Sequence, residues 1–291
     1  MHNIHILGAT NPTVQYFISK NNKKEKIYLY SSKEKNILDL KSYNYNQFKN
    51  IFNDKDIVIS LIPIDRLSYY LGEIREKNKF PNLIIACSST SIYSKVLEKS
   101  PDRFLYQKFL NGEHSLMNYF LNISKNINCE LIILRLSLLW GGKKDKNINF
   151  IFEMFNKFRI FPVLKNNCFG KRFPLHHSYL AETLLRIIEN KIATGIYSLQ
   201  GPEQISYFDM INTIKCKVNK KTFLVQLPLF ILNLSLRISS FLKIKKLISI
   251  LMMIKRQAND LDFRDYNHLP KRVLPKENEY YKFKKLINYL Y

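Results

Sequence analysis

Short runs of apolar residues alternate with longer segments of mixed polarity through the first half of the chain. The runs at 4–7, 26–30, 57–61, 83–87 and 131–134 have the length and composition of buried β-strands. The segments between them, near 12–20, 45–52, 65–77 and 104–126, have the spacing of helices. Strands that alternate with helices in this way predict a parallel sheet covered on both faces.

The alternation of apolar runs with segments of helical spacing becomes less regular after Gly141 and Gly142. We predict helices near 147–158 and 178–189, an irregular stretch over 161–174, and one more strand near 195–200 that returns to the sheet. The remainder is predicted to be mostly helical. The expected division is a sheet domain over 1–141, with the returning strand, and a smaller lobe over 142–291.

The first apolar run ends at Gly8, and the next helix begins at Asn11 and Pro12. This is the form of a dinucleotide-binding turn, in which glycines let the backbone approach a pyrophosphate at a helix N-terminus. The usual spacing would place further glycines at Asn11 and Val14. Asparagine tolerates a positive φ and is also a strong N-cap. Pro12 suits the first helical position but removes one N–H that could bind phosphate.

Ligands of such sheets bind at the carboxyl ends of the strands. The loops that follow the first three predicted strands are therefore the expected cofactor site. The residues predicted to contact the cofactor are Gly8, Thr10, Asn11, Ser31, Lys33, Leu61 and Pro63.

The chain is strongly basic, with 46 Lys and Arg against 23 Asp and Glu and a formal net charge of +23. Such an excess suits nucleic acid, a membrane surface or an anionic substrate. The basic residues are scattered, with only short runs such as Lys23-Lys24, which is typical of a lysine-rich composition. Nucleic-acid footprints are clustered, so we predict no nucleic-acid partner.

The four cysteines are far apart and have no metal-site spacing with the histidines, so no metal is predicted. Nothing at the N-terminus resembles a signal peptide, which favours a cytoplasmic location. The most hydrophobic region, 223–254, is interrupted by Pro228, Arg237 and several lysines. This pattern favours a helical core over a membrane span, with a peripheral membrane contact as the open alternative.

Four further segments follow one another in a characteristic order. They are CSSTSIY at 87–93, LRLSLLWG at 134–141, RFPLH at 172–176 and YSLQGPE at 197–203. With these segments the chain resembles the extended short-chain dehydrogenase/reductase superfamily, in its nucleotide-sugar epimerase/dehydratase branch, over nearly its whole length. The resemblance implies an α/β fold with a Rossmann-type doubly wound parallel sheet and a smaller, mostly helical C-terminal substrate lobe. It also implies an NAD(P) cofactor and a sugar-nucleotide substrate.

The same resemblance implies that Ser89 hydrogen-bonds the reacting sugar. The usual acid/base of the superfamily is a tyrosine with a lysine four residues later and a glutamate four residues after that. With Glu113 as the glutamate, Leu105 and Phe109 occupy the other two positions, so the standard pair is absent. Tyr93 and Lys95, just beyond Ser89, are the substitute candidates.

Tyr106 and Lys108 are only two residues apart, which on a helix turns them about 200° from each other. They are therefore poorly placed to share one cofactor. Ser31 and Lys33, with no acid before Glu34, favour NADP over NAD. In the second lobe Arg172 could clamp a diphosphate, and Asn147 and His176 are further candidate substrate contacts.

The leading hypothesis is an NAD(P)-dependent epimerase, dehydratase or reductase acting on a sugar nucleotide in bacterial surface polysaccharide synthesis. One alternative is a catalytically inactive nucleotide-binding regulator or scaffold, which the missing glycines and the missing Tyr/Lys pair favour. The other is an enzyme that acts on a lipid-linked sugar at the membrane face. The choice between a monomer and a homodimer stays open.

Overall fold

The computed structural model describes most of the chain. The described residues are 2–21, 25–33, 36–50, 53, 55–72, 80–95, 103–123, 129–142, 145, 148–165, 169–218, 221–259, 261, 267–276 and 281–290.

A sheet of eight strands forms the centre of the molecule, in the order β12-β7-β6-β5-β1-β2-β4-β3. Its strands are β1 (Ile4–Leu7), β2 (Ile27–Ser31), β3 (Asn36–Ile37), β4 (Leu40–Asn44), β5 (Ile57–Ser60), β6 (Leu83–Ser89), β7 (Glu130–Leu136) and β12 (Gly195–Leu199). All neighbouring pairs are parallel except β3 with β4. β1 and β5 are buried along their whole length, as their uninterrupted apolar runs predict. The predicted α/β fold with a parallel, Rossmann-type sheet is confirmed.

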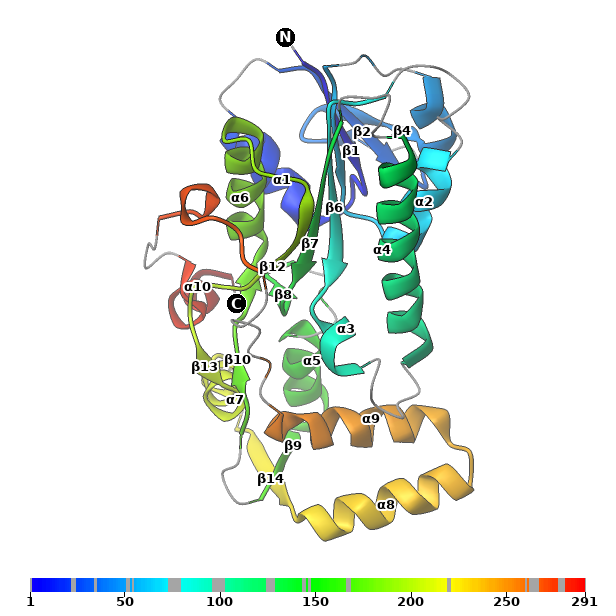
Figure 1. The fold of residues 1–291 in the computed structure, drawn as a ribbon. Helices are drawn as coiled ribbons and strands as arrows, with labels where there is room; N and C mark the ends of the chain where they lie inside the picture. Colours follow the sequence, from blue (N-terminus) through cyan, green and yellow to red (C-terminus); the bar gives the residue numbers. More distant parts are fainter. Residues whose placement is uncertain are drawn as a thin grey trace.

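Two layers of helices cover the sheet (Figure 1). α1 (Pro12–Lys20) and α6 (His177–Glu189) pack on one face, and α2 (Ile64–Gly72) and α4 (Arg103–Ile123) pack on the other. The segment that returns to the sheet therefore brings α6 as well as β12. The short helix α3 (Ser91–Lys95) follows β6 directly, at the carboxyl edge of the sheet.

The structure differs from the sequence prediction after β2. Residues 36–44 form the β3–β4 hairpin, whose turn has positive φ at Leu38 and Asp39. The helix expected near 45–52 is the 3₁₀-helix η1 (Tyr45–Asn50). The polar residues of β4 hide its strand character, because this strand lies near the edge of the sheet and buries little. Of the helix expected near 65–77, residues 73–79 lie outside the described residues.

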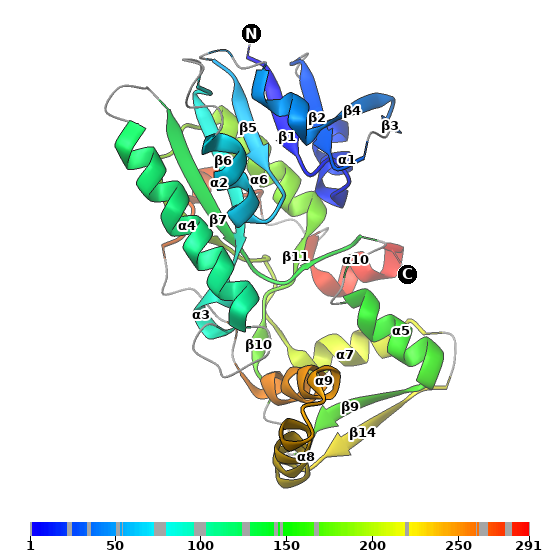
Figure 2. The ribbon, with the colours of Figure 1, turned by 90° about the vertical axis from the view of Figure 1, so that its right-hand side faces the viewer.

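The second lobe is built around another core (Figure 2). α5 (Ile148–Phe158), α7 (Tyr207–Lys215) and α10 (Phe283–Leu290) pack around Trp140 and Phe161. The remaining elements are the strand pairs β9 (Ile160–Leu164) with β14 (Phe223–Leu227), β10 (Lys171–Arg172) with β13 (Ile205–Ser206) and β8 (Leu139–Trp140) with β11 (Leu175–His176), and the 3₁₀-helix η4 (Lys271–Val273). The stretch expected to be irregular over 161–174 thus contains most of β9 and all of β10.

α8 (Leu229–Phe241), α9 (Lys245–Lys255) and the 3₁₀-helix η3 (Arg256–Ala258) lie at the end of the molecule remote from the N-terminus (Figures 1 and 2). The expectation that this region is helical holds from 229 onwards, but its assignment to the core is wrong in large part. Phe230 is 70% exposed and Phe241 is 86% exposed, whereas Leu232 and Ile254 are buried. Among the helices that the structure describes, none combines the length and apolarity needed to cross a bilayer.

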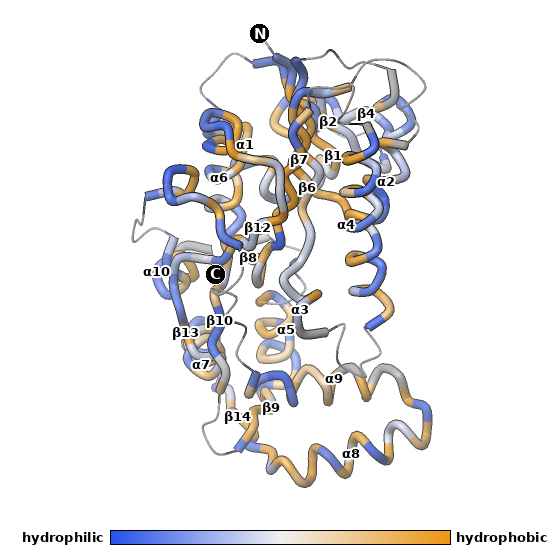
Figure 3. The backbone as a smooth tube through the Cα atoms, in the orientation of Figure 1, coloured by the Kyte–Doolittle hydropathy of each residue, from blue (hydrophilic) through white to orange (hydrophobic). Residues whose placement is uncertain are grey.

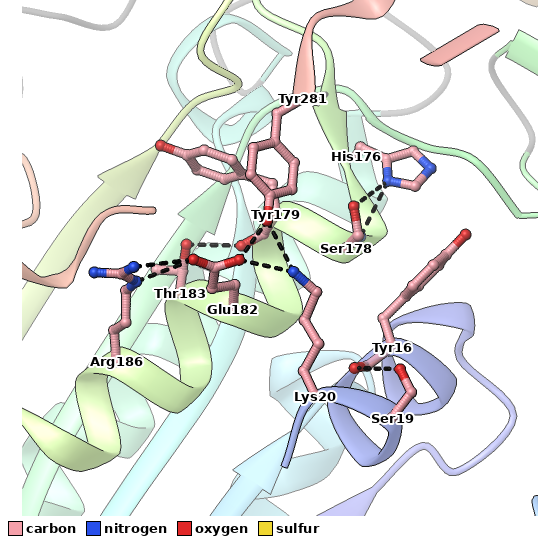
Figure 4. A network of polar contacts seen from close by, with 10 residues as sticks. All are labelled: Tyr16, Ser19, Lys20, His176, Ser178, Tyr179, Glu182, Thr183, Arg186 and Tyr281. Carbon is pink, nitrogen blue, oxygen red and sulfur yellow. Dashed lines mark hydrogen bonds and ion pairs between the residues drawn. The ribbon is translucent and has the colours of Figure 1, made fainter. Parts of the chain in front are cut away.

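A polar cluster ties the C-terminal segment to the sheet domain (Figure 4). Lys20 Nζ lies 2.7 Å from Glu182 Oε2 and 2.8 Å from the hydroxyl of Tyr281, which also donates to Glu182. Arg186 bonds the other oxygen of the same carboxylate at 3.0 Å. The cluster joins α1, α6 and the approach to α10, and none of its residues is in the described lining of either cavity, so we assign it to stability.

Candidate functional site

The first strand ends in a tight turn at Gly8, whose φ is +92°. A Cβ there would lie 3.1 Å from the backbone of Leu61, so the turn after β5 also excludes a side chain. Asn11 has φ −70° and caps α1, because its side chain accepts the N–H of Thr13 at 3.0 Å. Asn11 therefore serves as the N-cap, not as a substitute for glycine at positive φ.

The backbone donors of this turn are used within the chain. Gly8 and Ala9 both donate to the carbonyl of Tyr30, and Asn11 donates to that of Gly8. Thr13 donates to the Asn11 side chain and Val14 to the Asn11 carbonyl, while Pro12 has no N–H. The exposed Thr10 supplies the one N–H of residues 8–14 without a partner in the described part of the chain. Phosphate binding at a helix N-terminus needs several free N–H groups, so this turn does not fit a pyrophosphate.

Side chains from the other half of the molecule also cover the start of α1. Thr13 Oγ1 lies 2.8 Å from His177 Nδ1, and both residues are buried. A Cβ on Gly142 would lie 2.5 Å from the ring of Pro12. These contacts bring the chain after β8 directly onto the helix N-terminus.

A cavity of about 210 Å³, here called the turn cavity, lies beside this turn. Its wall includes Asn11, Leu61, Pro63, Phe109 and Leu180. Phe109 holds the position at which the sequence resemblance expects lysine, so an apolar ring stands where a cation would bind a cofactor ribose. The predicted contacts Leu61 and Pro63 do lie at a cavity, although their cofactor role stays a prediction.

A second cavity of about 370 Å³, here called the lobe cavity, lies between the carboxyl edge of the sheet and the second lobe. Its polar lining includes Ser89, Tyr106, Arg172, Tyr207 and Arg256. Ser88, Leu136 and Leu139 line both cavities, which places the two side by side.

The two serines that end β6 have different partners. Ser89 Oγ accepts the N–H of Ser91 at 3.2 Å and so caps the start of α3. Ser88 Oγ is buried and has no hydrogen-bond partner among the described residues, although it lies where the two cavities meet. An unsatisfied buried hydroxyl is costly, so a bound ligand is the natural partner for Ser88. Ser89 also lines the lobe cavity, and its predicted hydrogen bond to the sugar stays a prediction.

Tyr93 is held by other side chains of the sheet domain. Its ring stacks on the Arg135 guanidinium at 4.6 Å, and its hydroxyl lies 3.1 Å from Ser198 Oγ. Arg135 in turn pairs with the fully buried carboxylate of Glu113. Tyr93 is not part of the described lining of either cavity. The side chain of Lys95 lies outside the described residues, and the catalytic roles of both residues stay predictions.

α4 presents a different tyrosine to the site. Tyr106 lines the lobe cavity, whereas Lys108 places its Nζ 4.7 Å from the ring of Phe104. The two side chains thus diverge, as their spacing predicts. Leu105 is exposed and Phe109 lines the turn cavity. Neither side chain can donate or accept a proton, so the two positions of the missing Tyr/Lys pair carry no acid/base chemistry. Tyr106 is the hydroxyl that the sequence reasoning set aside.

Arg172 is buried at the wall of the lobe cavity. Its guanidinium donates to the carbonyls of Lys171 and Asn259 and, at 2.7 Å, to that of Arg256. It also stacks on the ring of Tyr207 at 4.9 Å, and burial raises the pKa of Tyr207 to about 12. These contacts fix the guanidinium at the wall of the cavity. Asn147 lies outside the described residues.

His176 is buried at the start of α6 and caps that helix. Its Nδ1 accepts the N–H of Ser178 at 3.1 Å, and a Cβ on Gly141, where φ is +97°, would lie 2.1 Å from its Nε2. Burial, with the nearby charge of Lys20, lowers the pKa of His176 to about 4. Burial likewise lowers the pKa of His177 to about 3. His176 is absent from the described lining of both cavities, and its substrate role stays a prediction.

Ser31 and Lys33 follow β2. Ser31 is buried, with its Oγ 2.9 Å from Ser42 Oγ and donating to the carbonyl of Lys33, while the Lys33 side chain is exposed. Within the described ranges, no group of three or more His, Cys, Asp or Glu side chains is placed to hold a metal ion.

No protein-family model matches the sequence, and no curated protein matches it. Solved structures do match the fold. UDP-N-acetylglucosamine 4-epimerase from Bacillus cereus has a TM-score of 0.57 at 16% identity, over 90% of this chain and 99% of that one. The human epimerase family protein SDR39U1, solved with NADPH, has a TM-score of 0.64 at 11% identity, and the match covers 99% of this chain and 98% of that one. UDP-glucuronic acid 4-epimerase from Bacillus cereus, solved with UDP-glucuronic acid and NAD, has a TM-score of 0.57 at 16% identity, over 78% and 86%.

This chain has the fold of the extended short-chain dehydrogenase/reductases. The fold inferred from the four ordered sequence segments is thereby confirmed. Identities of this size establish the fold alone, so the function has to be argued from the two cavities.

Proposed function

We propose that this protein binds a nucleotide-linked sugar in the lobe cavity. The observation that carries the proposal is the lining of that cavity, in which Arg172 and Arg256 occur together with hydroxyl-bearing residues such as Ser88, Ser89 and Tyr106. Guanidinium groups suit a diphosphate, and hydroxyl groups suit a sugar. The volume of about 370 Å³ is within the range of small-ligand sites. Structures of the same fold have been solved with UDP-sugars.

One version of this function includes turnover. In it the protein is an NAD(P)-dependent epimerase, dehydratase or reductase of surface polysaccharide synthesis in the cytoplasm. The unpartnered Ser88 hydroxyl where the cavities meet supports this version, as do the NAD and NADPH of the similar structures. Ser89, Tyr93 and Lys95 are its proposed catalytic residues, and Ser31 with Lys33 supports NADP.

The second version is binding without hydride transfer, as a regulator or scaffold. The used donors of the first turn and the apolar ring of Phe109 in the turn cavity both support it. The pyrophosphate of NAD(P) does not fit this turn, and we therefore give the second version precedence and derive no step through the cofactor.

Calorimetric titration with UDP-N-acetylglucosamine and UDP-glucuronic acid tests the shared core of both versions. We expect saturable binding of at least one of them, weakened about tenfold or more by Arg256→Ala, which removes a guanidinium from the cavity wall. The matched change in the turn cavity, Phe109→Ala, should leave the affinity within about twofold of the wild type. Absence of binding by a folded sample, or equal losses in both variants, would remove the proposal.

A further inference from the structure

Several exposed large apolar side chains gather on α8 and the turn that follows it. Phe230, Leu234, Ile238 and Phe241 are all more than half exposed. Their spacing of i, i+4, i+8 and i+11 puts them on one side of the helix, and we call them the α8 stripe. Leu242 and Ile244, also exposed, continue it into the turn before α9. Figure 3 shows hydrophobic positions recurring along α8 at the end of the molecule.

The opposite side of α8 accounts for its attachment to the protein. Leu232 is buried in a small core with Leu164, Leu251 and Ile254, and Leu236 packs against it. Ser239 is buried on the same side, with its hydroxyl bonded to the carbonyl of Ser235 at 2.6 Å. α8 therefore already has a packed face, and the α8 stripe is an additional apolar face directed to the outside. A contiguous exposed patch of this kind marks an interaction surface.

The charge around the stripe has one sign. From Met210 to Asn259 the sequence contains no aspartate or glutamate. It contains ten basic residues, which are Lys215, Lys217, Lys220, Lys221, Arg237, Lys243, Lys245, Lys246, Lys255 and Arg256. Arg237 lies within the α8 stripe and is exposed, and Lys243 is exposed in the turn. The surface thus combines large apolar side chains with the exposed cations Arg237 and Lys243.

We propose that the α8 stripe is the contact of this protein with an anionic membrane surface. An interfacial helix buries its apolar side in the acyl boundary and holds its cations at the lipid phosphates. A second copy of this chain is the poorer occupant, because pairing two such surfaces would bring the exposed cations Arg237 and Lys243 of one copy against those of the other. The described helices are not suited to span a bilayer, so the contact is one of adsorption.

The position of the stripe relates the membrane to the candidate site. α9 packs along α8, and Met253 of α9 and Arg256 of η3 line the lobe cavity. A protein adsorbed through α8 would hold this cavity close to the lipid headgroups. The inference is independent of the proposed function and applies equally to both of its versions.

Flotation of the full chain with vesicles tests the proposal. We expect binding to equimolar phosphatidylglycerol and phosphatidylcholine at low salt, and about tenfold weaker partitioning at high salt or with phosphatidylcholine alone. Leu234→Asp should lower the partition coefficient about tenfold or more, because it places a charge in the stripe. Arg237→Gln should lower it less and should reduce its salt dependence.

The matched control is Leu121→Asp on α4, since Leu121 is 58% exposed and Leu234 is 56% exposed. This variant should bind vesicles as the wild type does, and near-equal thermal midpoints would show that both variants fold. The proposal is overturned if the wild type fails to bind anionic vesicles at low salt, or if both aspartate variants lose binding equally. It is also overturned if sedimentation shows a dimer that Leu234→Asp dissociates while vesicles are not bound, which would assign the stripe to a second copy.

Discussion

The turn cavity and the lobe cavity adjoin at the same edge of the sheet but differ in chemistry. The turn cavity is walled mainly by aliphatic and aromatic side chains, and all but one of the backbone donors beside it are used. The lobe cavity also has many apolar lining residues, but it adds Arg172, Arg256 and several hydroxyl-bearing residues. The comparison teaches that two adjoining cavities at one edge of this sheet can offer a ligand different chemistry, basic and hydroxyl-bearing in one and mainly apolar in the other.

The largest expected effect concerns the contacts of His176 and His177 with the chain at Gly141 and at the start of α1, here called the histidine junction. His176 and His177 are buried with pKa values of about 4 and about 3, below the value near 6.5 of an unfolded chain. The unfolded state therefore binds more protons below pH 6.5, and stability falls as the pH drops from there towards the folded pKa values. Between pH 7.5 and pH 5 the two histidines together should remove about 4 kcal/mol from the free energy of unfolding. Urea denaturation at both pH values measures this.

Histidine-to-asparagine variants isolate that effect. His177→Asn should reduce the difference in unfolding free energy between the two pH values by about half. His114→Asn is the control, because His114 is exposed on α4, and it should leave the difference unchanged. If the free energy of unfolding depends on pH equally in the wild type and in His177→Asn, His177 is not buried as a neutral side chain in the histidine junction.

The next effect concerns the fixed cation of the lobe cavity. Arg172→Ala removes a guanidinium that binds three backbone carbonyls and stacks on Tyr207. Two of these carbonyls, those of Lys171 and Arg256, keep a backbone N–H donor. We expect a loss of about 3 kcal/mol in the free energy of unfolding, measured by urea denaturation. Arg172→Lys should recover only part of it, because an ammonium cannot reproduce the planar fork.

Asn11→Ala is the corresponding change at the turn cavity, and it removes only the cap of α1. We expect it to lower the free energy of unfolding by about 1 kcal/mol. If Arg172→Ala and Asn11→Ala lower the free energy of unfolding equally, the buried charge of Arg172 does not distinguish the lobe cavity from the turn cavity.

The smallest effect is expected at Tyr93. Tyr93→Phe keeps the stack on Arg135 and removes the hydroxyl that contacts Ser198 and Arg135, so we expect the free energy of unfolding to fall by about 1 kcal/mol. Affinity for a UDP-sugar should not change, because Tyr93 is outside the described lining of the lobe cavity. Loss of turnover of an identified substrate in Tyr93→Phe, with stability retained, would instead support the version of the function that includes catalysis.

Buried apolar runs made much of the fold predictable from sequence. β1 and β5 are recognisable because every residue in them is buried, and Gly8 marks the turn because its conformation excludes other residues. β4 was missed because a polar strand near the sheet edge lacks such a run. β9 and β14 were missed because they pair with each other across a long stretch of chain, which no local pattern reveals.

The site was harder to predict because orientation decides it. Ser88 and Ser89 are adjacent and chemically identical, yet only Ser89 has a local partner. Arg172 was expected to clamp a ligand, and the structure adds the three carbonyls that fix it at the cavity wall. The exposure of α8 also escaped prediction, since a hydrophobic helix reads the same whether it meets a core or a membrane.

Titration of one folded sample with NADPH, NADH and UDP-N-acetylglucosamine tests the contrast between the cavities most directly. The account predicts saturable binding of the sugar nucleotide, with a thermal stabilisation that grows with its concentration, and no saturable binding of either dinucleotide. Tight binding of NADPH or NADH by a sample that does not bind the sugar nucleotide would contradict the account.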